Sequence, residues 1–572
     1  MINWSATTEL KRKINLVCAS MDAEHTGRRL FALDAFLWKR DSEEQNEIIQ
    51  RLGWLNLPDR SELNVNSVTE FAEQIREEGY KHVVLLGMGG SSLCSEVTRK
   101  TFAVAKGYLP LLVLDDTDPA QILALENKID IGRTLFIVAS KSGNTMETLC
   151  FFHYFHDQLV KKNKKHPGAN FIAITDAGTP LTKLAEHYCF KKVFITPSDI
   201  GGRYSVLSDF GLVPMALTGI DIKAILKSAG QMKSRCKSNP AAKNPGILLG
   251  IILGVCQQNG RDKVSFILSS SIKSFGYWVE QLLAESTGKE GRGLVPVNGE
   301  LTGTPAAYGN DRLFIHMYLP GDDNQTDEAK LKDLEKAGHT IVRIEVADKI
   351  ALGGEYYRWE IAVAIAGILI GINPFDQPDV EKSKLNTTKL LEGWIKEGSF
   401  KDAEDSIKKS EVQFKNSGTL QNSIAERLKI ITGTVLPNDY IALLPYFPLT
   451  PARAKLLQLW RQQMRNTLKV ATTLLNGPRY LHSTGQLHKG GPDTGIYLIL
   501  IGNEEEDLPI PGEKFGFSTL HRAQALGDLR SLKDKGRRVL LVSLGKNIDA
   551  GLTKLCKLVK KDKTLLIQQV MV

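Results

Sequence analysis

The chain has 572 residues, of which 42% are hydrophobic and 24% are charged, with 73 Lys and Arg against 64 Asp and Glu. This composition is typical of a globular protein of several domains, and it excludes collagen-like, coiled-coil and disordered chains. The longest apolar stretches, residues 247–256 and 361–372, are too short to span a bilayer, so we expect no membrane partner.

Residues 1–15 are polar and lack the apolar core of an export signal, which predicts a cytoplasmic protein. The seven cysteines are scattered without a CxxC pair, which indicates reduced thiols and no zinc site. The positive charge lies in residues 401–572, which hold 26 basic and 16 acidic side chains. These bases are dispersed, so we expect no nucleic-acid partner, whereas a small anionic substrate is compatible with them.

Residues 1–65 contain charged, helix-like stretches and no strand-like run, which predicts an N-terminal helical arm. Beyond them, short apolar runs alternate with helix-length spacers, a pattern that favours βαβ units and parallel sheets. A first unit at 66–230 has expected strands at 82–86, 110–115, 134–140, 170–175 and 192–196. A second unit at 231–405 has expected strands at 264–269, 312–318 and 340–346.

A third unit, residues 406–572, contains a largely polar linking segment at 415–433. Its expected strands are 440–444, 495–501 and 538–543, with a long helix over 452–475. The predicted fold class is therefore α/β: two parallel-sheet domains with helices on both faces, an N-terminal helical arm and a C-terminal α/β domain.

A glycine-rich turn, Gly87-Met-Gly-Gly-Ser-Ser92, follows the first expected strand and precedes a helical pattern. Glycines let the backbone approach a ligand, and a helix N-terminus attracts an anion. The motif lacks the last glycine of a dinucleotide fingerprint, although Asp115 and Asp116 end the next strand at the distance expected of a ribose-binding acid. A nucleotide site and a plain tight turn both stay open for this motif.

A second loop, Ser140-Lys-Ser-Gly-Asn-Thr-Met-Glu-Thr148, also joins a strand to a helix. Its four hydroxyls suit the three oxygens of a phosphomonoester, which the loop amides would also contact. The alternative is a plain helix N-cap, in which Ser142 or Thr145 faces Glu147. Because one cap needs fewer hydroxyls, we predict a phosphate-binding loop.

These two loops, in this order, resemble the sugar isomerase family of sugar-phosphate-binding domains. Three further motifs, Gly201-Gly-Arg-Tyr-Ser205, Ala284-Glu-Ser-Thr-Gly-Lys289 and Asn373-Pro-Phe-Asp-Gln-Pro-Asp-Val-Glu381, make the chain similar to glucose-6-phosphate isomerases. The closest resemblance is to the bacterial clade in which that enzyme occurs linked to a transaldolase. The resemblance to glucose-6-phosphate isomerases covers residues 80–390. The N-terminal arm and the C-terminal unit resemble the transaldolase-linked clade and no other members.

The resemblance implies sugar isomerase-type domains at 66–230 and 231–405 and a cofactor-free, metal-free interconversion of glucose 6-phosphate and fructose 6-phosphate. This reaction needs a base, a ring-opening acid and a group that stabilises an enediolate. Gln281 and Glu285 are four residues apart on an amphipathic helix and so share a face.

The resemblance makes Glu285 the base, Arg203 the enediolate stabiliser and Lys384 a ring-opening group, with Lys382 as a rival for the last role. Without the motif, Glu285 would be a surface residue at a helix end. The remaining implied substrate-binding residues are Gly90, Ser91, Ser140, Lys141, Ser142, Thr145, Gln281 and Gln377.

The ring-opening histidine of ordinary members is missing from residues 299–312. His316 follows inside an apolar strand, where a core histidine is favoured. The Gly-rich, cationic segment 477–491 carries His482 and His488, which we consider as substitutes, with a domain-interface role as the alternative.

Three other functions stay open: a dual glucose/mannose-phosphate isomerase, a non-catalytic sugar-phosphate-binding protein and an NAD-dependent enzyme. The expected partner is a small sugar phosphate, and a homodimer is compatible with the sequence.

Overall fold

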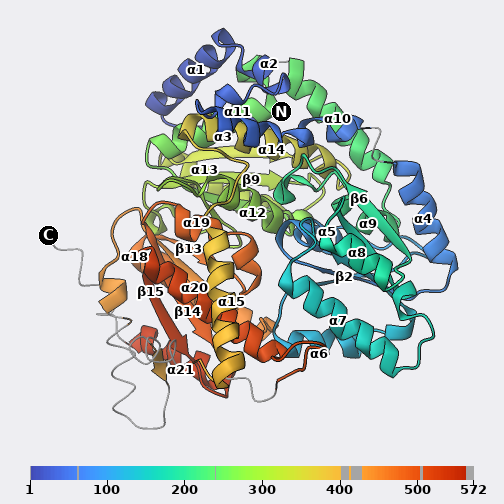
Figure 1. Ribbon diagram of the computed structural model, residues 1–572. Coiled ribbons are helices and arrows are strands. Elements are labelled where there is room, and N and C mark those ends of the chain that lie inside the picture. The colour runs from blue at the N-terminus through green and yellow to red at the C-terminus, as the bar shows by residue number, and fades with distance from the viewer. Residues whose placement is uncertain are drawn as a thin grey trace.

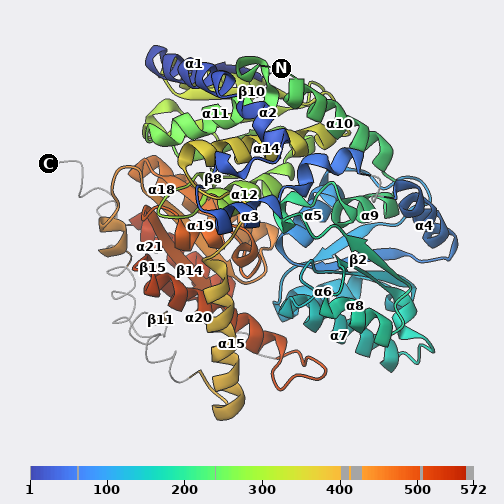
Figure 2. The same ribbon diagram turned by 45° about the horizontal axis from the view of Figure 1, so that its top comes forward.

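The computed structural model describes residues 2–60, 64–238, 240–400, 411–413, 428, 430–502 and 507–561. These residues form three units, each built on a five-stranded sheet, which meet around a common centre (Figures 1 and 2). Within these ranges no helix is long and apolar enough to cross a membrane. All seven cysteines are free thiols, and five of them are buried.

The first sheet is entirely parallel, in the order β3-β2-β4-β5-β6. Its strands are β2 (His82–Gly87), β3 (Leu111–Leu114), β4 (Thr134–Ala139), β5 (Phe171–Asp176) and β6 (Lys192–Thr196). The connecting helices are α5 (Leu93–Thr101), α6 (Pro119–Lys128), α7 (Met146–Lys161) and α8 (Pro180–His187). The five predicted strands are confirmed to within one residue at each end.

The second sheet contains two strands that were not predicted from the sequence, one of three residues and one of four. Its parallel strands are β7 (Lys263–Leu268), β8 (Val295–Val297), β9 (Arg312–Tyr318) and β10 (Thr340–Glu345). Strand β1 (Ile2–Ser5) pairs antiparallel with the outer edge of β10, so the prediction of an opening segment without strands is wrong here. Ile2 and Trp4 alternate with polar residues and pack against the core, which is the pattern of a half-buried edge strand.

The rest of the arm is helical, as predicted. It forms α1 (Thr8–Ala23), α2 (Thr26–Phe31) and α3 (Ser42–Ile49). Helix α1 contacts α11 (Pro245–Gln258), which packs on α14 (Leu352–Ile370), so the arm covers the second unit.

The third sheet is also parallel, with strands β11 (Glu411–Gln413), β12 (Tyr440–Tyr446), β13 (Ala471–Leu474), β14 (Gly495–Ile501) and β15 (Arg538–Ser543). The helix predicted over 452–475 is too long. Helix α18 (Pro451–Leu468) ends where Lys469 adopts a left-handed φ of 58°, and β13 follows. Most of the predicted linking segment, residues 414–427 and 429, lies outside the described residues, as does the boundary expected at 405/406.

All three sheets share one strand order. Numbered within each unit, β3-β2-β4-β5, β8-β7-β9-β10 and β13-β12-β14-β15 all read 2-1-3-4. In such sheets the strand order reverses beside the first strand, and ligands bind at the carboxyl ends of the strands there. In the first unit this position lies between β2 and β4, the strands that precede the two predicted ligand loops.

Two helices connect the units. Helix α10 (Ile222–Ser238) runs across the boundary expected at residues 230/231 and packs on α14. Helix α15 (Val380–Glu397) leaves the second unit and lies along α20 (Phe517–Asp534) of the third (Figure 1).

Candidate active site

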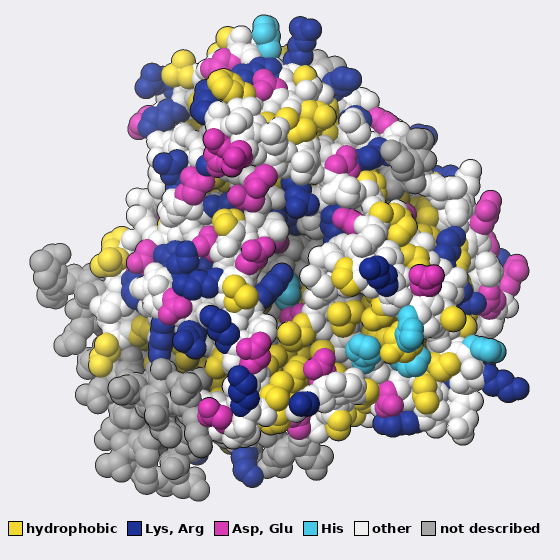
Figure 3. Space-filling model, viewed as in Figure 1, with side chains coloured by type: hydrophobic (Ala, Val, Ile, Leu, Met, Phe, Trp, Pro, Cys, Tyr) yellow, Lys and Arg dark blue, Asp and Glu magenta, His cyan; other side chains and the backbone are white. Residues whose placement is uncertain are grey.

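The candidate site lies at the carboxyl ends of β2 and β4, where the three units meet, and Figure 3 shows this face hollowed at its centre. The turn η3 (Gly89–Ser91) contacts both η6 (Gly202–Tyr204) of the first unit and η10 (Arg479–His482) of the third. A Cβ on Gly90 would lie 2.4 Å from the carbonyl oxygen of Gly202, and one on Gly89, whose φ is 54°, would lie 2.5 Å from that of His482. Close packing against these carbonyl oxygens is therefore enough to explain both glycines, and a nucleotide site is not needed to account for them.

The predicted phosphate loop holds two of its four hydroxyls together at the N-terminus of α7. The Ser140 and Thr145 hydroxyls are 2.9 Å apart, and the Ser142 hydroxyl donates to Asn144 Oδ1 at 2.6 Å. Thr145 occupies the N-cap position, but its hydroxyl contacts Ser140 and does not cap α7. The plain N-cap interpretation therefore does not explain the loop, whereas the first amides of α7 suit an anion.

The ammonium group of Lys141, in the same loop, forms its contacts within the protein. Its ammonium group contacts Asp176 at 2.6 Å and donates to the Pro197 carbonyl at 2.9 Å. Burial lowers the pKa of Lys141, although Asp176 opposes this effect. The structure thus uses Lys141 to hold the loop against the end of β5.

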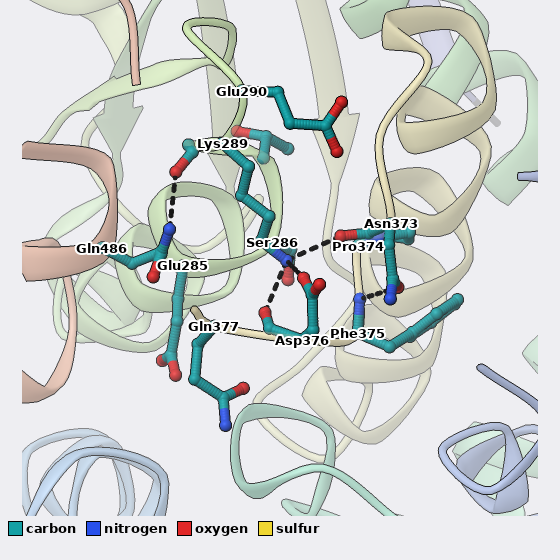
Figure 4. A network of polar contacts seen from close by, with 12 residues as sticks. Glu285, Ser286, Lys289, Glu290, Asn373, Pro374, Phe375, Asp376, Gln377 and Gln486 are labelled. Carbon is teal, nitrogen blue, oxygen red and sulfur yellow. Dashed lines mark hydrogen bonds and ion pairs between the residues drawn. The ribbon is translucent and has the colours of Figure 1, made fainter. Parts of the chain in front are cut away.

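The predicted shared face of Gln281 and Glu285 is confirmed on α12 (Phe275–Thr287). Gln281 Nε2 donates to Glu285 Oε2 at 2.9 Å, and the Arg203 guanidinium lies 3.3 Å from Glu285 Oε1. Arg203 also donates to Gln377 Oε1 at 2.9 Å, and Figure 4 shows Glu285 and Gln377 extending in the same direction. The structure thus brings four predicted site residues together.

Two cationic side chains, those of Lys289 and Arg203, hold the segment that carries Gln377. Lys289 Nζ contacts the Asn373 carbonyl at 2.6 Å and Asp376 Oδ1 at 2.5 Å (Figure 4). Arg203 donates to the Pro374 carbonyl at 2.7 Å. Burial, together with Arg203, lowers the pKa of Lys289 to about 7. Arg203 of the motif at 201–205 and Lys289 of the motif at 284–289 therefore hold the motif at 373–381 in place.

The third unit reaches the site through η10. The backbone carbonyl of His482 accepts a hydrogen bond from Gln281 Nε2 at 2.8 Å, and the imidazole Nε2 lies 2.7 Å from Glu147 Oε1. Burial raises the pKa of Glu147, but the contacts with His482, a hydrogen bond from its own backbone N–H and the charge of Lys384 together outweigh burial, and the pKa lies below its usual value. From the sequence, Glu147 was expected only as an N-cap partner, and its pairing with His482, 335 residues away, was not predicted.

His488 is not brought to the other candidate residues. It lies on α19 (Gly485–Gly490), is 1% exposed, and packs between the rings of Tyr480 and Tyr497 at 5.6 and 4.9 Å. Burial holds the pKa of His488 well below its usual value. Its neighbour on α19, Gln486, donates to the Gly288 carbonyl at 3.0 Å and so joins α19 to the end of α12 (Figure 4).

The two candidate lysines on α15 point to different neighbours. The ammonium group of Lys382 lies 3.6 Å from the carboxylate of Asp534 on α20. Lys384 is exposed, and its charge contributes to the lowered pKa of Glu147. The structure therefore favours Lys384 as the lysine on the side of the candidate site.

Comparisons with known proteins agree with this geometry. Residues 63–308 match the family model of phosphoglucose isomerase. Glucose-6-phosphate isomerases of Methanocaldococcus jannaschii and Streptococcus thermophilus are each 28% identical, over 57% and 59% of this chain and 90% and 86% of those proteins.

Two crystal structures share the fold. A hypothetical protein from Thermus thermophilus has a TM-score of 0.58 at 25% identity, covering 68% of this chain and 99% of that one. A glucose-6-phosphate isomerase from Chlamydia trachomatis has a TM-score of 0.55 at 17% identity, covering 69% of this chain and 89% of that one. Residues 63–308 of this chain are therefore similar in sequence to phosphoglucose isomerases, and the chain shares the fold of the Chlamydia trachomatis enzyme.

Proposed function

We propose that the chain interconverts glucose 6-phosphate and fructose 6-phosphate. The observation that carries this proposal is the contact of one partly exposed carboxylate, Glu285, with the Arg203 guanidinium from another segment and with the Gln281 amide of its own helix. Moving a proton between adjacent carbons needs a carboxylate base beside a fixed positive charge, and this cluster supplies both.

Substrate binding begins at the phosphate. The hydroxyls of Ser140, Ser142 and Thr145, together with the first amides of α7, are the proposed phosphate ligands. Gly90 and Ser91 lie on the adjoining turn η3, where their backbone can approach the sugar. From this loop the sugar extends toward Glu285 and Gln377.

Ring opening breaks the C1–O5 bond. The electron pair goes to O5, which takes a proton, while the C1 hydroxyl passes its proton to water and becomes the aldehyde. We assign the donor role to the imidazolium form of His482: ionised Glu147 accepts from Nε2–H, Nδ1–H gives its proton to O5, and the ring is left neutral with its proton on Nε2. Lys384 supplies positive charge on the same side.

The isomerisation then passes through an enediolate. Glu285 removes the C2 proton, the C–H electron pair forms the C1–C2 double bond, and O1 becomes an anion beside Arg203. The O2 proton moves to O1, Glu285 returns its proton to C1, and C2 becomes the ketone. Each atom is accounted for without a cofactor.

A coupled assay on the purified protein tests this proposal. Fructose 6-phosphate should yield glucose 6-phosphate without added metal or cofactor, and absence of turnover refutes the proposal. Calorimetric binding of fructose 6-phosphate without turnover would instead favour a non-catalytic binding protein. A parallel assay with mannose 6-phosphate tests the dual isomerase.

A further inference from the structure

Glu147 has a second partner from the third unit. The side-chain amide of Gln524, on α20, donates through Nε2 to Glu147 Oε1 at 2.7 Å, the same oxygen that contacts His482. Its carbonyl Oε1 accepts from the hydroxyl of Thr117 at 2.7 Å. Gln524 is 3% exposed, and Thr117 is fully buried, so solvent competes with neither bond.

The order of these bonds fixes where the protons are. An ionised carboxylate only accepts hydrogen bonds, so the NH₂ group of Gln524 must face Glu147 and its carbonyl oxygen must face Thr117. The Thr117 hydroxyl donates to that oxygen, which opposes reversal of the amide. Two donors on one oxygen favour the charged carboxylate, and the charged carboxylate in turn requires a proton on His482 Nε2.

We propose that Gln524 is a positioning residue for ring opening, because its amide, oriented by Thr117, keeps Glu147 as the acceptor for His482 Nε2–H. The chain of contacts runs Thr117, Gln524, Glu147, His482 and alternates between the first and third units at every step. It couples the ring-opening histidine to the docking of the third unit. This inference rests on the proposed function of the site.

The test replaces Gln524 by Met, which keeps the volume and removes the amide. One lost hydrogen bond to a charged group lowers turnover by about 10- to 100-fold, and we expect this loss in kcat with little change in KM. Losing a donor also raises the pKa of Glu147, so the acid limb of the kcat–pH profile should move to higher pH. Thr117→Val should lower kcat and shift the acid limb in the same directions, but less strongly. Thr117→Ser keeps the hydroxyl and should behave like the wild type.

An isotope effect separates ring opening from proton transfer. In a Glu285→Asp background, transfer of the C2 proton is slowed, and glucose 6-phosphate deuterated at C2 should turn over more slowly than the unlabelled sugar. Adding Gln524→Met slows ring opening, so the isotope effect should shrink toward 1. Damage to packing alone would lower the active fraction and leave the isotope effect unchanged.

Gln486→Met is the matched control, because Gln486 is also a buried glutamine between the third unit and its neighbour but does not contact Glu147. Its isotope effect and pH profile should stay as in the parent. If Gln524→Met leaves both readouts unchanged while the wild type isomerises fructose 6-phosphate, the inference is overturned and the proposed function stands. If the wild type shows no isomerase activity, the proposed function fails first.

Discussion

The two glutamates of the site occupy opposite surroundings. Glu285 lies in the last turn of α12, where the helix dipole disfavours negative charge, and its side chain is 15% exposed. Glu147 lies in the first turn of α7, where the dipole favours negative charge, and its two side-chain partners come from the third unit. The proposed base is thus a partly exposed carboxylate at a helix C-terminus, whereas Glu147 is a buried carboxylate at a helix N-terminus.

The largest effect should come from Glu285. Glu285→Gln keeps the shape and removes the basicity, so kcat should fall by ~10² to 10⁴, the range of general base catalysis, while calorimetry still detects fructose 6-phosphate binding. Glu147→Gln should lower kcat less, since its carboxylate does not take the C2 proton. Near wild-type turnover in Glu285→Gln would refute its role as the base.

A second experiment separates the two histidines of the third unit. His482→Ala should lower kcat by about 10² with little change in Tm, because His482 faces the site. His488→Ala should lower Tm by several degrees and largely keep kcat, because it removes a buried ring from between two tyrosines. Matched losses of activity and Tm in His482→Ala, or full activity in that variant, would return η10 to a structural role.

Substitutions in the phosphate loop should weaken substrate binding without altering the surroundings of Glu285 or Glu147. Replacing Ser142 and Thr145 together by Ala removes two hydroxyls, and KM should rise by ~10- to 10²-fold with a smaller change in kcat. Steady-state kinetics with fructose 6-phosphate measure both constants. An unchanged KM would exclude these hydroxyls as phosphate ligands.

The smallest effect concerns Glu280, the neighbour of Gln281 on α12. Burial raises its pKa to about 8. The unfolded chain loses this proton near pH 4.5 and the folded chain keeps it, so the stability that Glu280 contributes falls as the pH rises from 4.5 to 8. Glu280→Gln removes this loss, and the Tm of the variant relative to wild type should rise between pH 5 and pH 8. A pH-independent difference would contradict the assignment.

The sequence predicted the long, doubly buried strands well, because parallel strands such as β4 and β9 appear as continuous apolar runs. Some strands of three or four residues, such as β8 and β13, were missed, because so short a run resembles a helix segment or a loop, whereas β3, also of four residues, was predicted. The third unit's shared strand order lay beyond prediction, since it depends on β13.

The contact between Gln281 and Glu285 was predictable from their spacing of four residues on an amphipathic helix, whereas their selection as site residues depended on the family resemblance. Gln524 was not, because it is an ordinary polar residue of α20, and its contact with Glu147 spans 377 residues of sequence. His482 and His488 occur in one segment, and only packing distinguishes the one that faces the site. Local sequence thus indicated which chemistry is present, whereas the docking of the third unit decides which groups take part.

The strand β1 has a practical consequence. Its pairing with β10 occupies backbone N–H and C=O groups that would otherwise form an open sheet edge. Exposed edges recruit strands from other molecules, so a truncation that removes Ile2–Ser5 should promote aggregation and leave the chemistry of the distant site intact. An affinity tag fused directly before Ile2 would disturb the same pairing. A tag for expression is therefore better placed at the other terminus or joined through a long flexible spacer.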